Sequence, residues 1–167
     1  MIREATHSDI NIIHDMSVEL AVYAREPDAV LATPGDLEAA LFGPAPALFA
    51  HVAEDESGTV VGFALWFLNY STWLGRHGIY LEDLYVKPEH RGAGHGVALL
   101  STLANICIER GYGRLEWWVL DWNTPARDFY VSIGADALTE WIPYRVTGDS
   151  LGALATKIPR NEHENST

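Results

Sequence analysis

The chain has 167 residues, a length typical of one domain with its own hydrophobic core. Its 23 acidic and 11 basic side chains give a formal net charge of -12, which disfavours nucleic acid as a partner and favours a cationic one. A single cysteine, Cys107, excludes an intramolecular disulfide and a cysteine-based metal cluster. No leader-like start and no membrane-spanning apolar run are present, so we expect a cytoplasmic protein that binds no membrane.

The first third of the chain predicts one strand and two helices. Residues 2–5 form a short strand-like run, and Thr6 or Ser8 can cap the helix that follows it. Thr33 before Pro34 marks the start of a second helix, which ends near Gly43. The apolar positions of the first helix recur at intervals of three and four: Ile12, Ile13, Met16, Leu20 and Tyr23.

The middle of the chain predicts an antiparallel meander of three strands. Residues 48–53 and 60–69 flank a polar turn, and residues 79–86 make a further apolar and aromatic strand. A long helix follows at 97–110, where Gly111 suits a helix end. The sheet edges are not fixed by this pattern.

The last third predicts a strand at 115–120, a helix that begins at Asn123, and strand-like chain at 137–146. The polar segment 159–167 is predicted to be a disordered tail. This order of elements predicts an α+β fold with a mixed, mostly antiparallel sheet, in one domain over residues 1–158.

The most informative stretch joins the strand at 79–86 to the helix at 97–110 through a glycine-rich loop. Glycines at 92, 94 and 96 allow positive φ angles and close approach to a ligand, and Arg91 adds a cation. Backbone N–H groups and the helix dipole then favour a phosphate group. A plain tight turn is the alternative. A P-loop is excluded because no Gly-Lys-Ser/Thr follows, and a dinucleotide fingerprint fits poorly because no βαβ series precedes the loop.

The run Arg91-Gly92-Ala93-Gly94-His95-Gly96 matches the Q/R-x-x-G-x-G/A signature and resembles the pyrophosphate loop of the GCN5-related N-acetyltransferase (GNAT) superfamily. Four further segments resemble most closely its diamine (spermidine/spermine) N-acetyltransferase branch. They are Tyr80-Leu81-Glu82-Asp83, Trp73-Leu74-Gly75, Trp122-Asn123-Thr124-Pro125, and Asp128-Phe129-Tyr130 ahead of Gly134-Ala135.

This resemblance implies a GNAT fold with splayed central strands, acetyl-CoA as co-substrate, and a homodimer with the late strands at its interface. It places the acetyl-CoA pyrophosphate on residues 91–96 and the pantetheine arm along the backbone near Leu84 and Val86. It also assigns a cofactor contact to Asn123, which alternatively caps a helix, and to Tyr130.

Acetyl transfer to an amine requires a neutral amine, although an alkyl ammonium has a pKa of about 10.4. The resemblance makes Glu82 the general base, acting directly or through a water. Strand alternation would put Glu82 and Asp83 on opposite faces, so both face the amine only if the strand bulges. Alternatively, the two are an exposed carboxylate and a structural ion pair.

The leaving thiolate needs a proton, and the resemblance assigns this role to Tyr130, which could instead be a packing aromatic. Direct attack by the amine is expected, because Cys107 lies in the apolar stripe of the helix behind the loop. The histidines lack metal-ligand spacing, so no metal is expected.

The acceptor is the least determined feature. Aromatic and acidic side chains suited to a cationic amine are Trp73, Tyr23, Glu26 and Trp141, in addition to Asp83. Ser71 and a lone Glu140 depart from the diamine pattern. A polyamine or diamine is the first hypothesis. A lysine-like amino acid, an aminoglycoside, a protein N-terminus and a non-catalytic acyl-CoA-binding module stay open.

Overall fold

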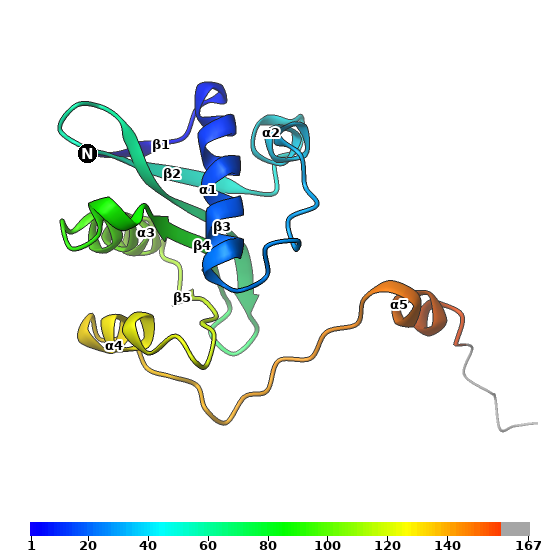
Figure 1. The fold of residues 1–167 in the computed structure, drawn as a ribbon. Coiled ribbons are helices and arrows are strands. Elements are labelled where there is room, and N and C mark those ends of the chain that lie inside the picture. The colour runs from blue at the N-terminus through cyan, green and yellow to red at the C-terminus, as the bar shows by residue number, and fades with distance from the viewer. Residues whose placement is uncertain (158–167) are drawn as a thin grey trace, which may run out of the picture. The chain divides into compact units, whose positions relative to one another are not determined.

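The computed structural model describes residues 1–157 of the chain. Two units are distinguished, Met1–Trp122 and Asn123–Thr167, and each is described by itself (Figure 1). The predicted tail at 159–167 lies outside the described residues. One domain over residues 1–158 stays a prediction.

The first unit contains an open five-stranded sheet whose strands are ordered as they occur in the chain. The first four strands pair antiparallel, and the fifth pairs parallel to the fourth. The predicted meander is therefore correct, although the strand predicted at 115–120 is shorter than expected. The strands are β1 (Ile2–Glu4), β2 (Phe49–Glu54), β3 (Val60–Ser71), β4 (Arg76–Val86) and β5 (Leu115–Glu116).

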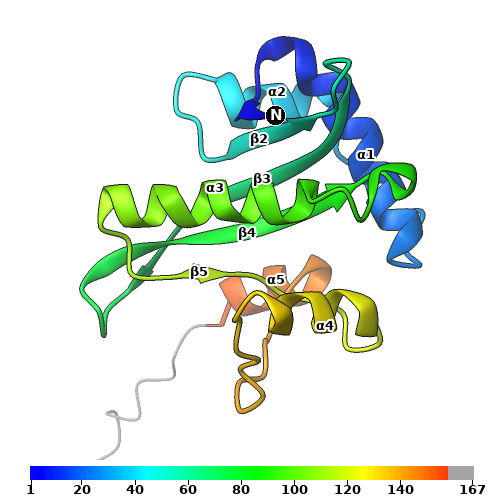
Figure 2. The same cartoon turned by 90° about the vertical axis from the view of Figure 1, so that its left-hand side faces the viewer.

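Helices cover both faces of this sheet. Figures 1 and 2 show α1 (Ile10–Tyr23) and α2 (Pro34–Phe42) on one face and α3 (His95–Arg110) on the other. The short 3-10 turns η1 (His7–Asp9) and η2 (Pro88–His90) precede α1 and the glycine-rich loop. The main core joins α1 and α2 to the sheet through Ile13, Met16, Val52, Phe63, Leu65 and Tyr85.

Local capping explains where the early helices begin. Thr33 and Asp36 form a reciprocal capping box at α2, in which the Thr33 side chain accepts from the Asp36 N–H at 3.2 Å. At η1 the Asp9 carboxylate accepts from the Thr6 N–H at 2.7 Å. Thr33 therefore sets the start of α2, as the sequence predicts, whereas Thr6 precedes η1 and the N-cap of α1 is Asp9.

The second unit contains α4 (Thr124–Ser132) and α5 (Gly148–Ala155). The predicted helix after Asn123 is confirmed, but residues 137–146 form no strand, and α5 was not predicted. A strand needs a hydrogen-bonding neighbour, and no strand of the described sheet pairs with this segment.

These features are the α+β, mixed-sheet architecture that the sequence predicts. The splay of the central strands is also present, because β5 pairs with β4 only at Ile79 and Tyr80 within the described residues. None of the helices within residues 1–157 is long and apolar enough to cross a membrane.

Candidate active site

A β-bulge at Glu82 organises the candidate site. On the neighbouring strand β3, Leu65 is in register with Asp83 and Trp66 with Leu81, so Glu82 is the extra residue. Adjacent residues of β3 face opposite sides of the sheet, and therefore Leu81 and Asp83 do so too. Asp83 is therefore on the face of Leu65, which carries α1, and the bulge frees Glu82 from strict alternation, the condition under which both carboxylates can meet one amine.

The bulge also turns the backbone of β4 after Asp83. Before it, the Ile79 N–H donates to the Arg114 carbonyl on the β5 side, at 3.0 Å. After it, the Lys87 N–H donates to the Val61 carbonyl on the β3 side, at 2.9 Å. Without a bulge these two N–H groups, eight residues apart, would point the same way. Backbone groups of the even-numbered residues after the bulge therefore face away from β3.

This reversal determines the direction of the Leu84 and Val86 backbone groups. Their backbone groups point toward the part of the β4 edge that β5 leaves unpaired within the described residues. The Val86 carbonyl accepts from Arg91 Nε at 2.9 Å. An open strand edge of this kind can hydrogen-bond an extended amide-containing chain such as pantetheine.

The glycine-rich loop uses positive φ angles at two of its three glycines. Gly92 has a φ of 78° and Gly94 a φ of 86°, and Gly94 is the N-cap of α3. Gly96 differs from the expectation, because it is the second residue of α3 and has no positive φ. Once the turn has been made, the chain is already helical and needs no special angle.

The N-terminus of α3 offers a set of donors to an anion. The first helical bond runs from the Ala98 N–H to the Gly94 carbonyl, at 2.9 Å. The N–H groups of His95, Gly96 and Val97 precede it and have no intrahelical acceptor. Together with the helix dipole they fit a phosphate group, and the family resemblance predicts that the pyrophosphate of acetyl-CoA lies on this loop.

Arg91 is held beside this helix end by two aromatic rings. Its guanidinium carbon lies 5.1 Å from the centre of the Tyr23 ring and 5.5 Å from that of Tyr85. The Tyr85 hydroxyl donates to Glu19 at 2.9 Å, which fixes the second ring. Arg91 is thus held by its ring contacts and its bond to Val86 while its side chain stays exposed.

Tyr23, which the sequence predicts to contact the acceptor amine, therefore lies beside Arg91 of the glycine-rich loop. Its ring is also 6.2 Å from that of Trp122, over which Arg25 stacks at 4.1 Å. An acceptor contact by Tyr23 stays a prediction.

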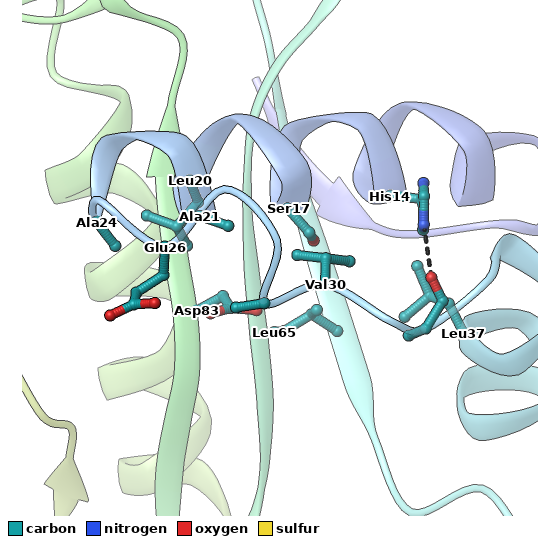
Figure 3. A pocket seen from close by; sticks show the side chains of 12 residues that line it. His14, Ser17, Leu20, Ala21, Ala24, Glu26, Val30, Leu37, Leu65 and Asp83 are labelled. Carbon is teal, nitrogen blue, oxygen red and sulfur yellow. Dashed lines mark hydrogen bonds between the residues drawn. The ribbon is translucent and has the colours of Figure 1, made fainter.

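A cavity of about 360 Å³ opens between α1, the segment after it, and strands β3 and β4. Figure 3 shows Asp83 and Glu26 among its labelled lining residues. Most of the wall is aliphatic, and it comes from α1, the segment between α1 and α2, the start of α2, and β3. The apolar lining residues are Leu20, Ala21, Ala24, Ala29, Val30, Ala32, Leu37 and Leu65.

Asp83 is the electrostatically unusual residue of this cavity. Burial and, to a lesser extent, the nearby negative charge of Glu82 together raise the pKa of its carboxyl group to about 6. A carboxylate with such a pKa can exchange a proton near neutral pH, which is what a general base requires. Glu82, which the family resemblance makes the general base, is exposed, and that role stays a prediction.

The sequence missed most of this wall. Ala21 on α1 and Ala24, the C-cap residue three positions later, line the cavity, and Tyr85 supports Arg91. Small residues at helical spacing are a weak signal, since the same pattern accompanies close packing against a sheet.

Trp73 lies in the β3–β4 turn and is 88% exposed, away from the residues that line the cavity. The Ser71 hydroxyl accepts from the Leu74 N–H at 3.2 Å, so Ser71 closes this turn. Within the described chain the structure does not bring Trp73 to Asp83, and its acceptor contact stays a prediction.

The remaining predicted residues belong to the second unit. Asn123 caps α4, with its side-chain oxygen accepting from the Ala126 N–H at 3.3 Å. Tyr130 is half-buried on the same helix, its ring 5.4 Å from that of Phe129. Trp141 is 62% exposed in the segment after α4. The capping role is confirmed, and the cofactor and acceptor roles stay predictions.

Cys107 is buried on α3, and burial raises the pKa of its thiol. It lies twelve residues after the start of the helix at His95, roughly 18 Å along the axis. Within residues 1–157, no three His, Cys, Asp or Glu side chains are grouped as a metal site.

Comparisons with known proteins give the arrangement a context. The acetyltransferase (GNAT) family matches residues 13–135. A thialysine N-epsilon-acetyltransferase of Bos taurus is 40% identical over 167 residues, covering 94% of this chain and 98% of its own length. An L-ornithine N5-acetyltransferase of Arabidopsis thaliana is 30% identical, covering 92% of this chain and 86% of its own.

A spermidine/spermine N(1)-acetyltransferase-like protein of Homo sapiens is 32% identical over 163 residues, which cover 92% of this chain and 23% of that protein. Among solved structures, an integron cassette protein from the mobile metagenome of V. cholerae superimposes with a TM-score of 0.78 at 28% identity, covering 94% of this chain and 98% of its own.

Proposed function

This chain belongs to the acetyltransferase (GNAT) family and is an N-acetyltransferase that acts on amines, and we propose that its acceptor is the side-chain amine of a small lysine-like amino acid. The observation that carries the proposal is the buried Asp83 carboxylate in a cavity whose other walls are mostly aliphatic. An alkyl chain fits the walls, and a terminal ammonium fits the carboxylate.

Relatives named for thialysine and ornithine support this acceptor class, since both are amino acids with an amine at the end of a short chain. A diamine or polyamine is the second candidate. The adjacent carboxylates Glu82 and Asp83 at the bulge and the likeness to the spermidine/spermine N(1)-acetyltransferase-like protein favour it.

The residues that would hold acetyl-CoA are the donors at the start of α3, Arg91, and the backbone of Leu84 and Val86 on the open strand edge. When bound, acetyl-CoA supplies an activated thioester. Asn123 and Tyr130 complete the set in our proposal, which for them rests on the family motif rather than on contacts.

In the reaction we assign two tasks to the carboxylates of the bulge. Asp83 holds the acceptor's ammonium group and takes a proton from it, because its raised pKa brings it closer to that of the amine. Glu82 keeps the Asp83 pKa high and gives the proton a route to solvent, since it is exposed. The neutral amine then attacks directly, and Tyr130 donates a proton to the departing thiolate.

Thiol release should be measured with a panel containing lysine, thialysine, ornithine, putrescine, spermidine, an aminoglycoside and a peptide N-terminus. The decisive pair is lysine and cadaverine, which share the amine and the carbon chain and differ by the α-carboxylate. We expect lysine-like amino acids to give the highest kcat/KM, and Nε-acetyl-lysine to give no turnover because its side-chain amine is blocked.

Higher kcat/KM for cadaverine and the polyamines would transfer the proposal to the diamine candidate. Turnover of the aminoglycoside or the peptide alone would contradict both. Acetyl-CoA binding without turnover of any amine would indicate a non-catalytic acyl-CoA-binding module.

Direct attack is tested by Cys107→Ala. Since the thiol is buried on α3 behind the loop, we expect kcat to change less than twofold. A loss of kcat above a hundredfold, with an unchanged circular dichroism spectrum, would instead point to an acyl-enzyme on Cys107.

We also propose, from the family resemblance, a homodimer formed through segment 137–146. This segment has strand-like composition, and its Ile142 and Tyr144 are 73% and 90% exposed. Sedimentation velocity on the full chain and on Ile142→Asp tests it, with dimer expected for the first and monomer for the second. A cytoplasmic location stays a prediction that cell fractionation tests.

A further inference from the structure

A second cavity, of about 250 Å³, lies at the C-terminal end of α3, the opposite end of that helix from the glycine-rich loop. Strand β2, the end of α2 and the last turns of α3 enclose it. Its lining shares no residue with the cavity that contains Asp83. Three side chains, Glu4, His51 and Arg110, bring charge or an unused hydrogen-bonding group to an otherwise apolar wall.

His51 contributes a neutral hydrogen-bond donor to this cavity. It is only 6% exposed, and Trp66 Nε1–H donates to its Nδ1 at 3.2 Å. Because Nδ1 accepts, the neutral ring carries its proton on Nε2. Burial lowers the pKa of His51 and keeps the ring neutral. Among the described residues Nε2–H has no hydrogen-bond acceptor, so this donor is available to a ligand.

Glu4 and Arg110 supply opposite charges at the same cavity. Glu4 is directly across from His51 in the β1–β2 register, and Arg110 is the last residue of α3. Within residues 1–157 neither side chain takes part in a salt bridge. A molecule that carries both a positive and a negative group is therefore complementary to the pair.

The remaining wall suits an apolar side chain. Phe49 stacks on Trp66 with 4.5 Å between ring centres, and Phe42 and Ile106 also line the space. An apolar cavity of about 150 Å³ is enough to bind benzene, so this one has room for a ring or a branched chain and a polar head group.

We propose that this cavity binds an apolar α-amino acid such as phenylalanine or leucine. Its carboxylate would accept from His51 Nε2–H and pair with Arg110, its ammonium group would pair with Glu4, and its side chain would pack on the Phe49–Trp66 wall. The site goes beyond the proposed acceptor chemistry and does not depend on it, because the two cavities are lined by different residues.

Isothermal titration calorimetry on the full chain tests the proposal with three probes. L-Phenylalanine carries both charges, 3-phenylpropionate lacks the ammonium group, and phenethylamine lacks the carboxylate. We expect one phenylalanine per chain and at least tenfold weaker binding of either analogue. Arg110→Gln should weaken the binding of phenylalanine tenfold or more and leave the binding of phenethylamine unchanged. Glu4→Gln should weaken the binding of phenylalanine by the same factor and leave the binding of 3-phenylpropionate unchanged.

Matched variants locate the binding. Ile106→Trp fills the cavity and should abolish phenylalanine binding, while Ile108→Trp, at a position on the same helix that is 78% exposed, should bind like the wild type. Both should retain thiol-release activity, which shows that they are folded. Asp83→Asn should still bind phenylalanine.

Absence of phenylalanine binding to the wild type would overturn the proposal. So would binding that survives Ile106→Trp, binding lost in Asp83→Asn, or equal affinity for 3-phenylpropionate. A failed amine panel with phenylalanine bound as expected would affect only the proposed function.

Discussion

At the scale of single residues, burial of the Asp83 carboxylate lowers the free energy of unfolding at neutral pH. A folded-state pKa of about 6 lies above the value of about 3.9 for an unfolded aspartate. The folded chain therefore holds a proton that the unfolded chain releases between pH 4 and 6, and the free energy of unfolding falls as pH rises through that range. Above pH 6 the full penalty is present.

We accordingly predict that Asp83→Asn stabilises the protein at pH 7.5 by up to about 3 kcal/mol while kcat/KM falls at least a hundredfold. Urea denaturation at pH 4 and pH 7.5 measures the first effect, and the gain should be small at pH 4. If the substitution destabilises the protein at pH 7.5, the carboxylate is held by a favourable contact and the proposed role as base loses its support.

Tyr130 is the residue whose role rests most on the motif. We predict that Tyr130→Phe lowers kcat by one to two orders of magnitude and changes the dissociation constant of acetyl-CoA less than threefold, because the hydroxyl acts on the leaving thiolate. Stopped-flow thiol release and calorimetric titration separate the two quantities. Tyr70→Phe, which removes a hydroxyl from a residue on β3 that is 53% exposed, serves as the control.

At the scale of elements, the start of α3 depends on one left-handed residue. Gly94 has a φ of 86°, where a side chain costs roughly 1–2 kcal/mol, whereas Gly96 is already inside the helix. We predict that Gly94→Ala lowers the melting temperature and weakens acetyl-CoA about tenfold, as turn and helix N-terminus lose their alignment.

Gly96→Ala is the matched control for this prediction. Alanine favours a helix by about 1 kcal/mol over glycine, so the melting temperature should rise or stay constant. Calorimetric unfolding measures both variants. A larger loss of stability in Gly96→Ala than in Gly94→Ala would contradict the assignment of the turn.

The sequence was informative wherever one local signal fixes an element. Thr33 before Pro34 gave the start of α2, and Asn123 gave that of α4. For the bulge, the sequence predicts only that Glu82 and Asp83 can both face the amine if the strand bulges. It does not predict the bulge itself, because no residue type marks the strand position that has no partner on the neighbouring strand. Segment 137–146 shows the limit of pattern reasoning, since strand-like side chains make no strand until a partner is present.

At the scale of the whole molecule, the net charge of -12 favours encounter with cationic acceptors and leaves the cationic side chains with particular tasks. Arg91 serves the phosphate site in our proposal. Arg3 joins the start of the chain to two acidic groups, with its guanidinium 2.7 Å from Asp9 and 2.7 Å from Glu54. Arg3 thus connects β1 to η1 and to β2.

This cluster predicts how the first unit responds to acid. The hydrogen bonds from Arg3 lower the pKa of Asp9 to about 2, against about 3.9 for an unfolded aspartate. A lowered carboxyl pKa contributes stability that is complete above pH 4 and is lost as pH falls toward 2. At neutral pH the contribution is on the order of 2 kcal/mol.

Asp9→Asn should therefore lower the free energy of unfolding by about 2 kcal/mol at pH 7, and the difference from the wild type should shrink between pH 4 and pH 2. Urea denaturation across this range measures it. Asp28→Asn, in the exposed segment between α1 and α2, removes a carboxylate outside the cluster and should leave the pH dependence unchanged. A difference for Asp9→Asn that stays constant down to pH 2 would mean that packing of the buried side chain, not its charge, holds η1 against β1.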